Sequence, residues 1–269
     1  MDRPIVVLDT ETATLLGAPH LLEIGAVRVV DGEAVDRFQM LVRPQVPVED
    51  GAFAIHGIAD QDVRDAPDAG EVLTHFCAWL GDDWMVAHGA RFDAGVLGFE
   101  CVRWGVPMPS GPMLDTVKLA RQLITDSPDH KLSTLCQWLD VEATIYHRAL
   151  PDAVSCWKVF EACVERMPAD PAPCAELLWS LCGRPVTVRT AAPRPPRIAP
   201  RLRPLEEACR AGSRLTVLYG EAERTSALCI SPRILFESRR RGYMEAECAR
   251  SGLLKTYRLD RVRSIQNGR

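Results

Sequence analysis

Three strand-like segments open the chain and limit the folds that it can adopt. They occupy residues 4–9, 21–30 and 35–43, and the "DGE" between the second and the third predicts a hairpin. Strand and helix patterns then alternate as far as residue 182. An antiparallel meander followed by such an alternation is typical of an α/β domain with a mixed sheet.

The later part of this domain is mostly helical. Prolines and a glycine within residues 44–63 predict a loop. Periodic apolar residues predict a short buried strand at 84–88 and helices at 69–80, 92–105, 114–124, 131–139, 151–167 and 171–182.

A change in composition after residue 182 divides the chain. Residues 183–204 contain six prolines and no acidic residue, which predicts a semi-rigid linker without helix or central strand. Beyond it, a short helix and several strands predict a small β domain. The expected domains are therefore residues 1–182 and 205–269, joined by the linker.

The charge of the chain is also divided. Residues 191–269 hold 17 of the 32 Lys and Arg residues but 8 of the 36 Asp and Glu residues, so their net charge is +9 and that of residues 1–190 is −13. An acidic domain joined to a basic one suits a metal-dependent site coupled to a polyanion-binding module. A solvated basic tail is the alternative interpretation.

The ten cysteines indicate a reducing compartment. They form no C-x-x-C pair and recur in apolar segments, so we interpret them mainly as core residues rather than zinc ligands. No apolar run approaches the roughly 20 residues that span a bilayer. The strand pattern begins too early to leave room for a signal peptide. These features predict a cytoplasmic protein without membrane contact.

Acidic residues follow the predicted strands where those strands end. Asp9 and Glu11 close the first strand, and alternation along a strand points both side chains the same way. Asp93 follows the strand at 84–88, and His147 and Asp152 stand where another helix begins. Alone, such a carboxylate is usually a helix cap and such a histidine is usually structural. Together, four carboxylates at one sheet edge require cations between them.

The order of these motifs resembles that of the DEDD superfamily of 3′→5′ exonucleases, in its histidine-bearing DEDDh branch. The motifs are "LDTET", "ARFDAGVL" and "HRALPDA", with His-x4-Asp spacing in the third. "AIHGI" and "LDT" at 114–116 are similar to further features of the proofreading-subunit group. The resemblance covers about residues 4–165. It implies an RNase H-like fold, with a mixed five-stranded sheet flanked by helices.

The resemblance also implies two divalent ions and hydrolysis of nucleotides from a 3′ end. Mg²⁺ and Mn²⁺ prefer carboxylate oxygens, and a pair of ions can stabilise both the attacking and the leaving oxygen. Asp9 would bridge the ions, Glu11 and Asp152 would complete the nucleophile-side ion, and Asp93 would support the second through water. His147 would take the proton of the attacking water, because histidine titrates near neutrality.

Two departures from the family pattern bear on the substrate. Ala13 and Thr14 stand where the family often has Thr-Gly, and Gly89 stands where the family usually has an Asn. Thr12 and Ala13 are expected to border the terminal nucleotide. His56 is a candidate for substrate contact, with a structural loop histidine as the alternative. We interpret Phe92, beside the second motif, as a core residue.

The C-terminal segment resembles WYL domains, small SH3-like β-barrels that are associated with binding nucleic acid or small ligands. "RLTVLYG", "GYMEAEC" and "KTYRLDRVRSI" support this, although only Tyr243 survives of the name-giving triplet. Arginines beside an aromatic residue suit phosphate contact and base stacking, and strand alternation would put Arg261 and Arg263 on one face. A solvated barrel surface is the alternative. The candidate nucleic-acid-binding residues are Arg239, Arg240, Arg241, Tyr243, Arg261 and Arg263.

The sequence thus predicts a bacterial, metal-dependent 3′→5′ exonuclease that acts on single-stranded DNA or frayed 3′ ends. The basic domain would raise the local concentration of substrate. One alternative is an exoribonuclease or oligonucleotide hydrolase, because a contact to the 2′-OH can come from backbone groups. Another is a regulator that binds a 3′ end and senses a ligand. A DNA polymerase or repair protein is a candidate partner, although no partner-binding motif stands out.

Overall fold

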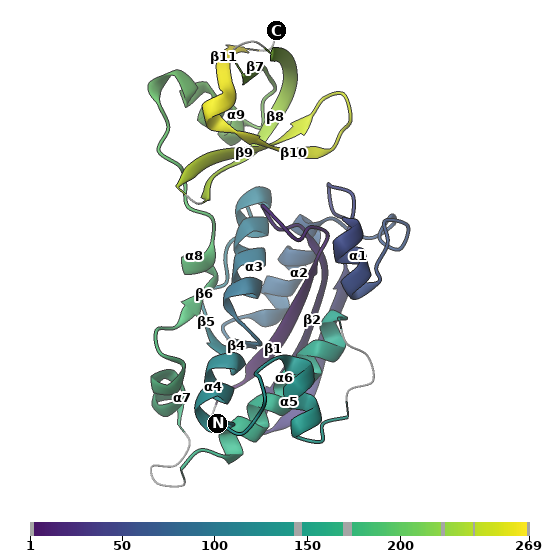
Figure 1. Cartoon of the computed structure of the whole chain (residues 1–269), viewed down its shortest axis with the longest axis vertical. Coiled ribbons are helices and arrows are strands. Elements are labelled where there is room, and N and C mark those ends of the chain that lie inside the picture. The colour runs from purple at the N-terminus through teal and green to yellow at the C-terminus, as the bar shows by residue number, and fades with distance from the viewer. Residues whose placement is uncertain (1–2, 143–146, 169–173, 222–223, 239, 268–269) are drawn as a thin grey trace. The chain divides into compact units, whose positions relative to one another are not determined.

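The computed structural model describes residues 3–142, 147–168, 174–221, 224–238 and 240–267. The chain divides into two compact units, residues 1–192 and 193–269. Figure 1 shows the order of the elements in each. In the described part of the chain, no helix combines the length and the apolar character that crossing a bilayer requires.

The first unit is built on one mixed sheet. Its strand order is β3-β2-β1-β4-β5-β6, with β1, β4 and β5 parallel and the other pairs antiparallel. The strands are β1 (Ile5–Thr12), β2 (Leu21–Val30), β3 (Glu33–Leu41), β4 (Trp84–Ala87), β5 (Pro112–Asp115) and β6 (Val186–Thr187). The mixed α/β sheet is confirmed, but it has six strands in the described residues rather than the predicted five.

Helices cover both faces of this sheet (Figure 1). One core lies between the sheet and α2 and α3, and the other between the sheet and α4 to α7. Since β1 contributes Val6 and Leu8 to one core and Ile5 and Val7 to the other, its apolar run is continuous rather than alternating. The helices are α1 (Asp50–His56), α2 (Ala69–Leu80), α3 (Arg91–Trp104), α4 (Thr116–Leu123), α5 (Leu132–Trp138), α6 (Ala149–Glu165), α7 (Ala175–Cys182) and α8 (Val188–Ala191).

Several short elements differ from the sequence prediction. Helix α1 lies within the predicted loop and ends at Gly57, whose φ of 70° gives a left-handed C-cap. Strand β5 occupies the start of the helix predicted at 114–124. Strand β6 and helix α8 lie within the predicted linker, because Val186 and Val188 are buried and Thr187 forms a capping box with Thr190. Tertiary burial outweighs local composition at these places.

The second unit is a five-stranded antiparallel sheet with one helix packed on β8. The strand order is β10-β9-β8-β7-β11, and no pairing joins β10 to β11 among the described residues. The predicted closed SH3-like barrel is therefore not confirmed, because closure requires the two edge strands to pair. The elements are η1 (Pro200–Leu202), α9 (Arg203–Ala211), β7 (Leu215–Glu221), β8 (Arg224–Ser238), β9 (Arg241–Cys248), β10 (Leu254–Arg258), η2 (Leu259–Arg261) and β11 (Val262–Asn267).

The segment predicted as one closing strand is two strands interrupted by η2. Arg261 belongs to η2, and Arg263 lies where the pairing of β11 with β7 shifts register. Strand alternation therefore does not relate these two side chains, and that part of the prediction is wrong. A single turn of 3₁₀-helix breaks the two-residue period on which the prediction depended.

The cysteines follow the prediction in part. All ten are free thiols, and five of them are buried core residues: Cys101, Cys136, Cys156, Cys163 and Cys182. Cys229, in contrast, is exposed on β8.

Candidate active site

The carboxylates predicted from sequence lie at one edge of the first sheet. Because β1, β4 and β5 are parallel, their carboxyl ends meet there. Asp9 and Glu11 lie near the end of β1, and Asp93 is in the first turn of α3, which follows β4. The Thr10 hydroxyl donates a hydrogen bond of 2.8 Å to Asp93 Oδ1, which ties the start of α3 to β1.

The third motif completes the cluster from the other face of the sheet. Ligand atoms of Glu11, His147 and Asp152 lie within 4.8 Å of one another. Asp152 is buried in the first turn of α6, whereas His147 is exposed and adopts a left-handed φ of 60°. The His147 N–H donates to Asp152 Oδ2 at 2.8 Å, while Asp152 Oδ1 is buried and has no hydrogen-bond partner in the described residues.

Burial raises the pKa of all four carboxyl groups, and the charges of neighbouring carboxylates add to it. Burial raises the pKa of Glu11 to about 8, and Asp152 and Glu23 add to this. Burial raises the pKa of Asp93 to about 7 despite the hydrogen bond from Thr10. The pKa of Asp9 lies well above its ordinary value because of burial and then the charges of Asp93 and Glu11. Burial also raises the pKa of Asp152.

A hard divalent cation fits this set of residues. Oxygen donors from several carboxyl groups are what Mg²⁺ and Mn²⁺ prefer, and the buried Asp152 Oδ1 has an open position for a ligand. Burial, with the charges of neighbouring carboxylates, raises the pKa of Asp9, Glu11 and Asp93, so the ionised carboxylates are disfavoured in the protein alone. Positive charge at this point would remove that penalty.

A fifth carboxylate adjoins the cluster but is neutralised by the protein. Glu23 on β2 is fully buried and pairs in register with Glu11. Burial alone would raise the pKa of Glu23, but hydrogen bonds from Arg148, Gln39 and the Ala149 N–H outweigh it, so the pKa is lowered. Glu23 was not among the residues predicted from sequence. The available signal was a single acidic residue inside the otherwise mostly apolar strand "LLEIGAVRVV".

The predicted substrate-binding residues lie beside the end of β1 and are largely buried. The Thr12 hydroxyl donates to the Thr14 carbonyl at 2.9 Å. Ala13 is fully buried, and its N–H donates to the His20 carbonyl at 2.8 Å. His56 is buried and accepts a hydrogen bond of 3.0 Å from the Ile58 N–H at Nδ1. Burial lowers the pKa of His56.

Gly89 has a conformational reason to be glycine. Its φ is 83°, a left-handed value, and its N–H donates to Asp115 Oδ1 at 3.1 Å. Glycine adopts this conformation without steric cost, and asparagine tolerates it better than most residues do. The departure from the family pattern at this position therefore preserves the backbone turn that leads into α3.

Exposed apolar side chains stand on the segments that carry or adjoin the site motifs. Phe92, next to Asp93, is 55% exposed, so its interpretation as a core residue is wrong. Leu15 and Leu16, in the loop after β1, are 51% and 82% exposed. Together with Phe92 they line a shallow cavity of about 230 Å³. The two leucines were not predicted from sequence, because an apolar pair in a loop has no periodicity to identify it.

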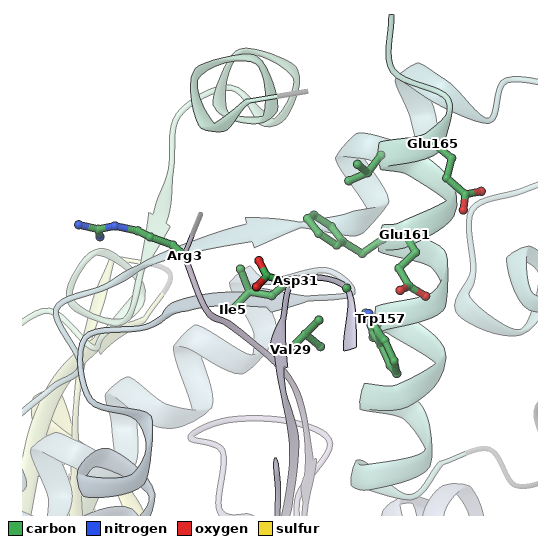
Figure 2. A pocket seen from close by; sticks show the side chains of 10 residues that line it. Arg3, Ile5, Val29, Asp31, Trp157, Glu161 and Glu165 are labelled. Carbon is green, nitrogen blue, oxygen red and sulfur yellow. The ribbon is translucent and has the colours of Figure 1, made fainter. Parts of the chain in front are cut away.

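A second cavity, of about 200 Å³, is not part of this cluster. Figure 2 shows it between the start of β1, at Ile5, and helix α6, at Trp157 and Glu161. Ile5 is the first residue of β1 and Glu11 is near its last, so about six strand residues, or roughly 20 Å, separate the two places. The cavity is therefore remote from the carboxylates.

The candidate residues of the second unit have mixed surroundings. Tyr243 stacks on Phe236 with ring centroids 5.5 Å apart, and Arg240 and Arg241 are exposed in the turn before it and at the start of β9. Arg261 pairs with Glu221 at 2.9 Å, and Arg263 donates to the Gly220 carbonyl at 2.9 Å. Arg239 lies outside the described residues.

Comparison with known proteins agrees with this geometry. A model of the exonuclease family matches residues 6–160, and a model of the WYL domain matches residues 200–267. The chain is 39% identical over 166 residues to the PolC-type DNA polymerase III of Oceanobacillus iheyensis, which covers 60% of this chain and 12% of that protein. It is 38% identical over 153 residues to the PolC-type enzyme of Bacillus subtilis, over 56% of this chain and 11% of that protein.

Solved structures show the same fold. Exonuclease X, determined in complex with 5′ overhanging duplex DNA, matches with a TM-score of 0.54 and 29% identity, over 66% of this chain and 99% of that one. E. coli exonuclease I matches with a TM-score of 0.58 at 13% identity, over 91% of this chain and 54% of that one, and supports the fold alone. The family model covers more than half of the chain, and the chain therefore belongs to the exonuclease family of DEDDh, DnaQ-like nucleases and carries a C-terminal WYL domain.

Proposed function

We propose that this protein is a metal-dependent 3′→5′ exonuclease that removes nucleotides from single-stranded DNA or from frayed DNA 3′ ends. One observation carries the proposal. Ligand atoms of Glu11, His147 and Asp152 lie within 4.8 Å of one another, at a sheet edge where Asp9 and Asp93 also lie. A site that only bound nucleic acid would not need four carboxylates beside a polyanion.

Two Mg²⁺ or Mn²⁺ ions are the proposed cofactors. Asp9 would contact both ions, Glu11 and Asp152 would complete the site on the nucleophile side, and Asp93 would support the second ion. When bound, the ions would supply charge stabilisation to the attacking and leaving oxygens of the phosphodiester. The raised pKa values of the free carboxyl groups support this assignment, because the ionised forms lack a compensating charge.

His147 is the proposed general base. Its position beside Glu11 and Asp152 puts the imidazole at the rim of the cluster, where its exposure lets a proton pass to solvent. The bond from its N–H to Asp152 Oδ2 fixes the backbone that carries it. A base of this kind must lie within hydrogen-bond reach of the water that it activates, directly or through one further water.

DNA is the proposed substrate on the strength of the relatives. The matched PolC-type proteins are DNA polymerases, and the exonuclease X structure holds duplex DNA. The chain spans about an eighth of the length of the polymerases, so association with a polymerase is a separate proposal. Exposed Leu16 and Phe92 beside the site suit contact with unpaired bases, which offer an apolar face.

Hydrolysis of matched oligonucleotides tests the proposal. Full-length protein with Mn²⁺ is expected to degrade single-stranded DNA at least 10-fold faster than RNA of the same sequence. Asp9→Asn is expected to abolish both activities, whereas Asp31→Asn, in the turn between β2 and β3, should leave them unchanged. Equal activity of Asp9→Asn and wild type would refute the proposed site. Faster hydrolysis of RNA would favour the exoribonuclease alternative.

The second unit is proposed to bind the substrate strand beyond the cleavage site. Replacing Arg240 and Arg241 together by alanine is expected to raise KM for long oligonucleotides roughly 3- to 10-fold and to leave kcat unchanged. The dependence of KM on salt should also weaken, because fewer counterions are released on binding. Steady-state kinetics from 50 to 200 mM salt measure both effects.

Arg233→Ala is the matched control for that pair of substitutions. Arg233 is an exposed arginine of the same unit, but its guanidinium is paired with Glu247 at 2.7 Å. If Arg233→Ala raises KM as much as the double variant does, total charge rather than the turn before β9 binds the strand.

A further inference from the structure

We propose that Glu23 and Arg148 form a clamp that positions His147 and Asp152 against Asp9 and Glu11. The clamp is defined as the Glu23 carboxylate with the Arg148 guanidinium and the Ala149 N–H. It rests on the proposed exonuclease function, since it assigns positioning residues to that site. Neither residue would touch the substrate or the reacting atoms.

Each oxygen of the Glu23 carboxylate accepts two hydrogen bonds. Oε1 accepts from Arg148 Nη2 at 2.9 Å and from Gln39 Nε2 at 3.0 Å. Oε2 accepts from Arg148 Nε at 2.9 Å and from the Ala149 N–H at 3.0 Å. A bidentate pair between arginine and a carboxylate fixes both distance and orientation, which a single ion pair does not.

These bonds reach directly into the third motif. Arg148 follows His147 in the chain, and Ala149 is the first residue of α6, whose first turn carries Asp152. The backbone N–H of His147 donates a hydrogen bond to the Asp152 carboxylate. The clamp therefore holds the backbone on the C-terminal side of His147 at the point where α6 begins.

The other end of the clamp lies beside the first motif. Glu23 pairs in register with Glu11, and Gly25 pairs with Asp9, so β2 and β1 carry the clamp and the first-motif carboxylates side by side. A Cβ at Gly25 would lie 2.1 Å from the Leu150 nitrogen, so the backbone of α6 packs directly on β2 there. Two independent features thus fix the start of α6 at the same place on β2.

Burying the Glu23 carboxylate has a desolvation cost that an apolar residue would not have, so stability alone does not explain its use to hold α6. This carboxylate is fully buried and lies near the carboxyl groups of Asp9, Glu11 and Asp152. A buried ion pair is often no more stable than apolar residues of similar volume. An apolar contact could hold α6 on the sheet, but it would not fix the direction of the first turn. The proposed benefit is the orientation of His147 and Asp152, since a misplacement of about 1 Å can cost about 100-fold in rate.

Glu23→Gln in the full-length protein tests the clamp. It keeps the shape of the side chain but removes the charge that pairs with Arg148. We expect kcat to fall 10- to 100-fold with KM within about 3-fold, and the affinity for Mn²⁺, measured by electron paramagnetic resonance without substrate, to fall about 10-fold. Arg148→Lys, which retains the charge but not the two-pronged geometry, should lose less of both.

Arg28→Lys is the matched control. Arg28 lies on the same strand, and its Nε pairs with Asp83 at 2.8 Å, away from the third motif. If Glu23 and Arg148 served stability alone, the clamp variants and Arg28→Lys would all unfold at a lower temperature. The kcat and the Mn²⁺ affinity of the folded variants would then equal the wild-type values. That result would overturn the proposal, and so would an equal loss of kcat in Arg28→Lys. If Glu23→Gln does not fold, the same comparison with Arg148→Lys decides.

The two proposals can fail separately. Absence of exonuclease activity in the wild type would refute the proposed function, and the Mn²⁺ measurement would still judge the clamp. Weaker Mn²⁺ binding by folded Glu23→Gln would support it, and unchanged binding would overturn it.

Discussion

Replacing His147 by alanine is expected to lower kcat by 10²- to 10⁴-fold, the usual effect of removing a general base. KM should change little, because the side chain is exposed at the rim and Asp152 remains in α6. Single-turnover hydrolysis of a labelled oligonucleotide measures the chemical step separately from binding. Added imidazole is expected to restore part of the rate, because the substitution leaves space open to solvent.

The backbone at His147 calls for a second variant. With φ at 60°, alanine adds strain that histidine and asparagine tolerate better. His147→Asn therefore removes the base with less disturbance of the turn and should lose a similar factor in kcat. His75→Ala, at an exposed histidine of α2, is the control for loss of an imidazole elsewhere. Wild-type kcat in both His147 variants would exclude His147 as the base.

Metal-free protein is expected to lose stability as the pH rises from about 4 to about 8. The folded-state pKa is about 8 for Glu11 and about 7 for Asp93, both above their ordinary values, so the folded state binds more protons in this range. Their stabilising contribution is complete below about pH 4 and is lost as the pH passes the folded-state values. Glu23 acts in the opposite sense, because its pKa is lowered and its contribution is lost on acidification.

The size of this loss is expected to be on the order of 3 kcal/mol. One pKa unit corresponds to about 1.4 kcal/mol, and the partial exposure of Glu11 and the coupling between the carboxyl groups reduce the sum. Chemical denaturation in EDTA at pH 5 and pH 8 measures it, and Mn²⁺ should restore more stability at pH 8. Glu11→Gln should flatten the pH dependence, whereas Asp31→Asn should not. Stability that rises with pH in both wild type and Glu11→Gln would contradict the account.

The residues of the site could be predicted from the sequence more completely than the details of the fold around them. Asp9 and Glu11 follow from strand alternation, and Asp93 and Asp152 from their places at helix starts after recognisable motifs. The structure brings these residues to one sheet edge. Their catalytic roles, like that of His147, are proposals that the substitutions above test.

What could not be predicted depends on tertiary contacts. Strand β6 has two residues and forms only because β5 offers an edge and Val186 finds a core. Phe92 has an apolar side chain of the kind that usually lies in a core, yet it lies on the exposed side of the first turn of α3. The hydrogen bonds between Glu23 and Arg148 join residues 125 positions apart. Nothing in the sequence around either residue indicates that the other is its partner.

The polarity and metal dependence of hydrolysis test the central claim most directly. A single-stranded DNA oligonucleotide is labelled at its 5′ end in one sample and at its 3′-terminal nucleotide in another, and each is incubated with wild type in Mn²⁺ or in EDTA. In Mn²⁺, the 5′ label should appear in a ladder of strands that shorten one nucleotide at a time, and the 3′ label should appear at once as a mononucleotide. EDTA should abolish both. Retention of the 3′ label on shortened strands, or equal hydrolysis in EDTA, would contradict the account.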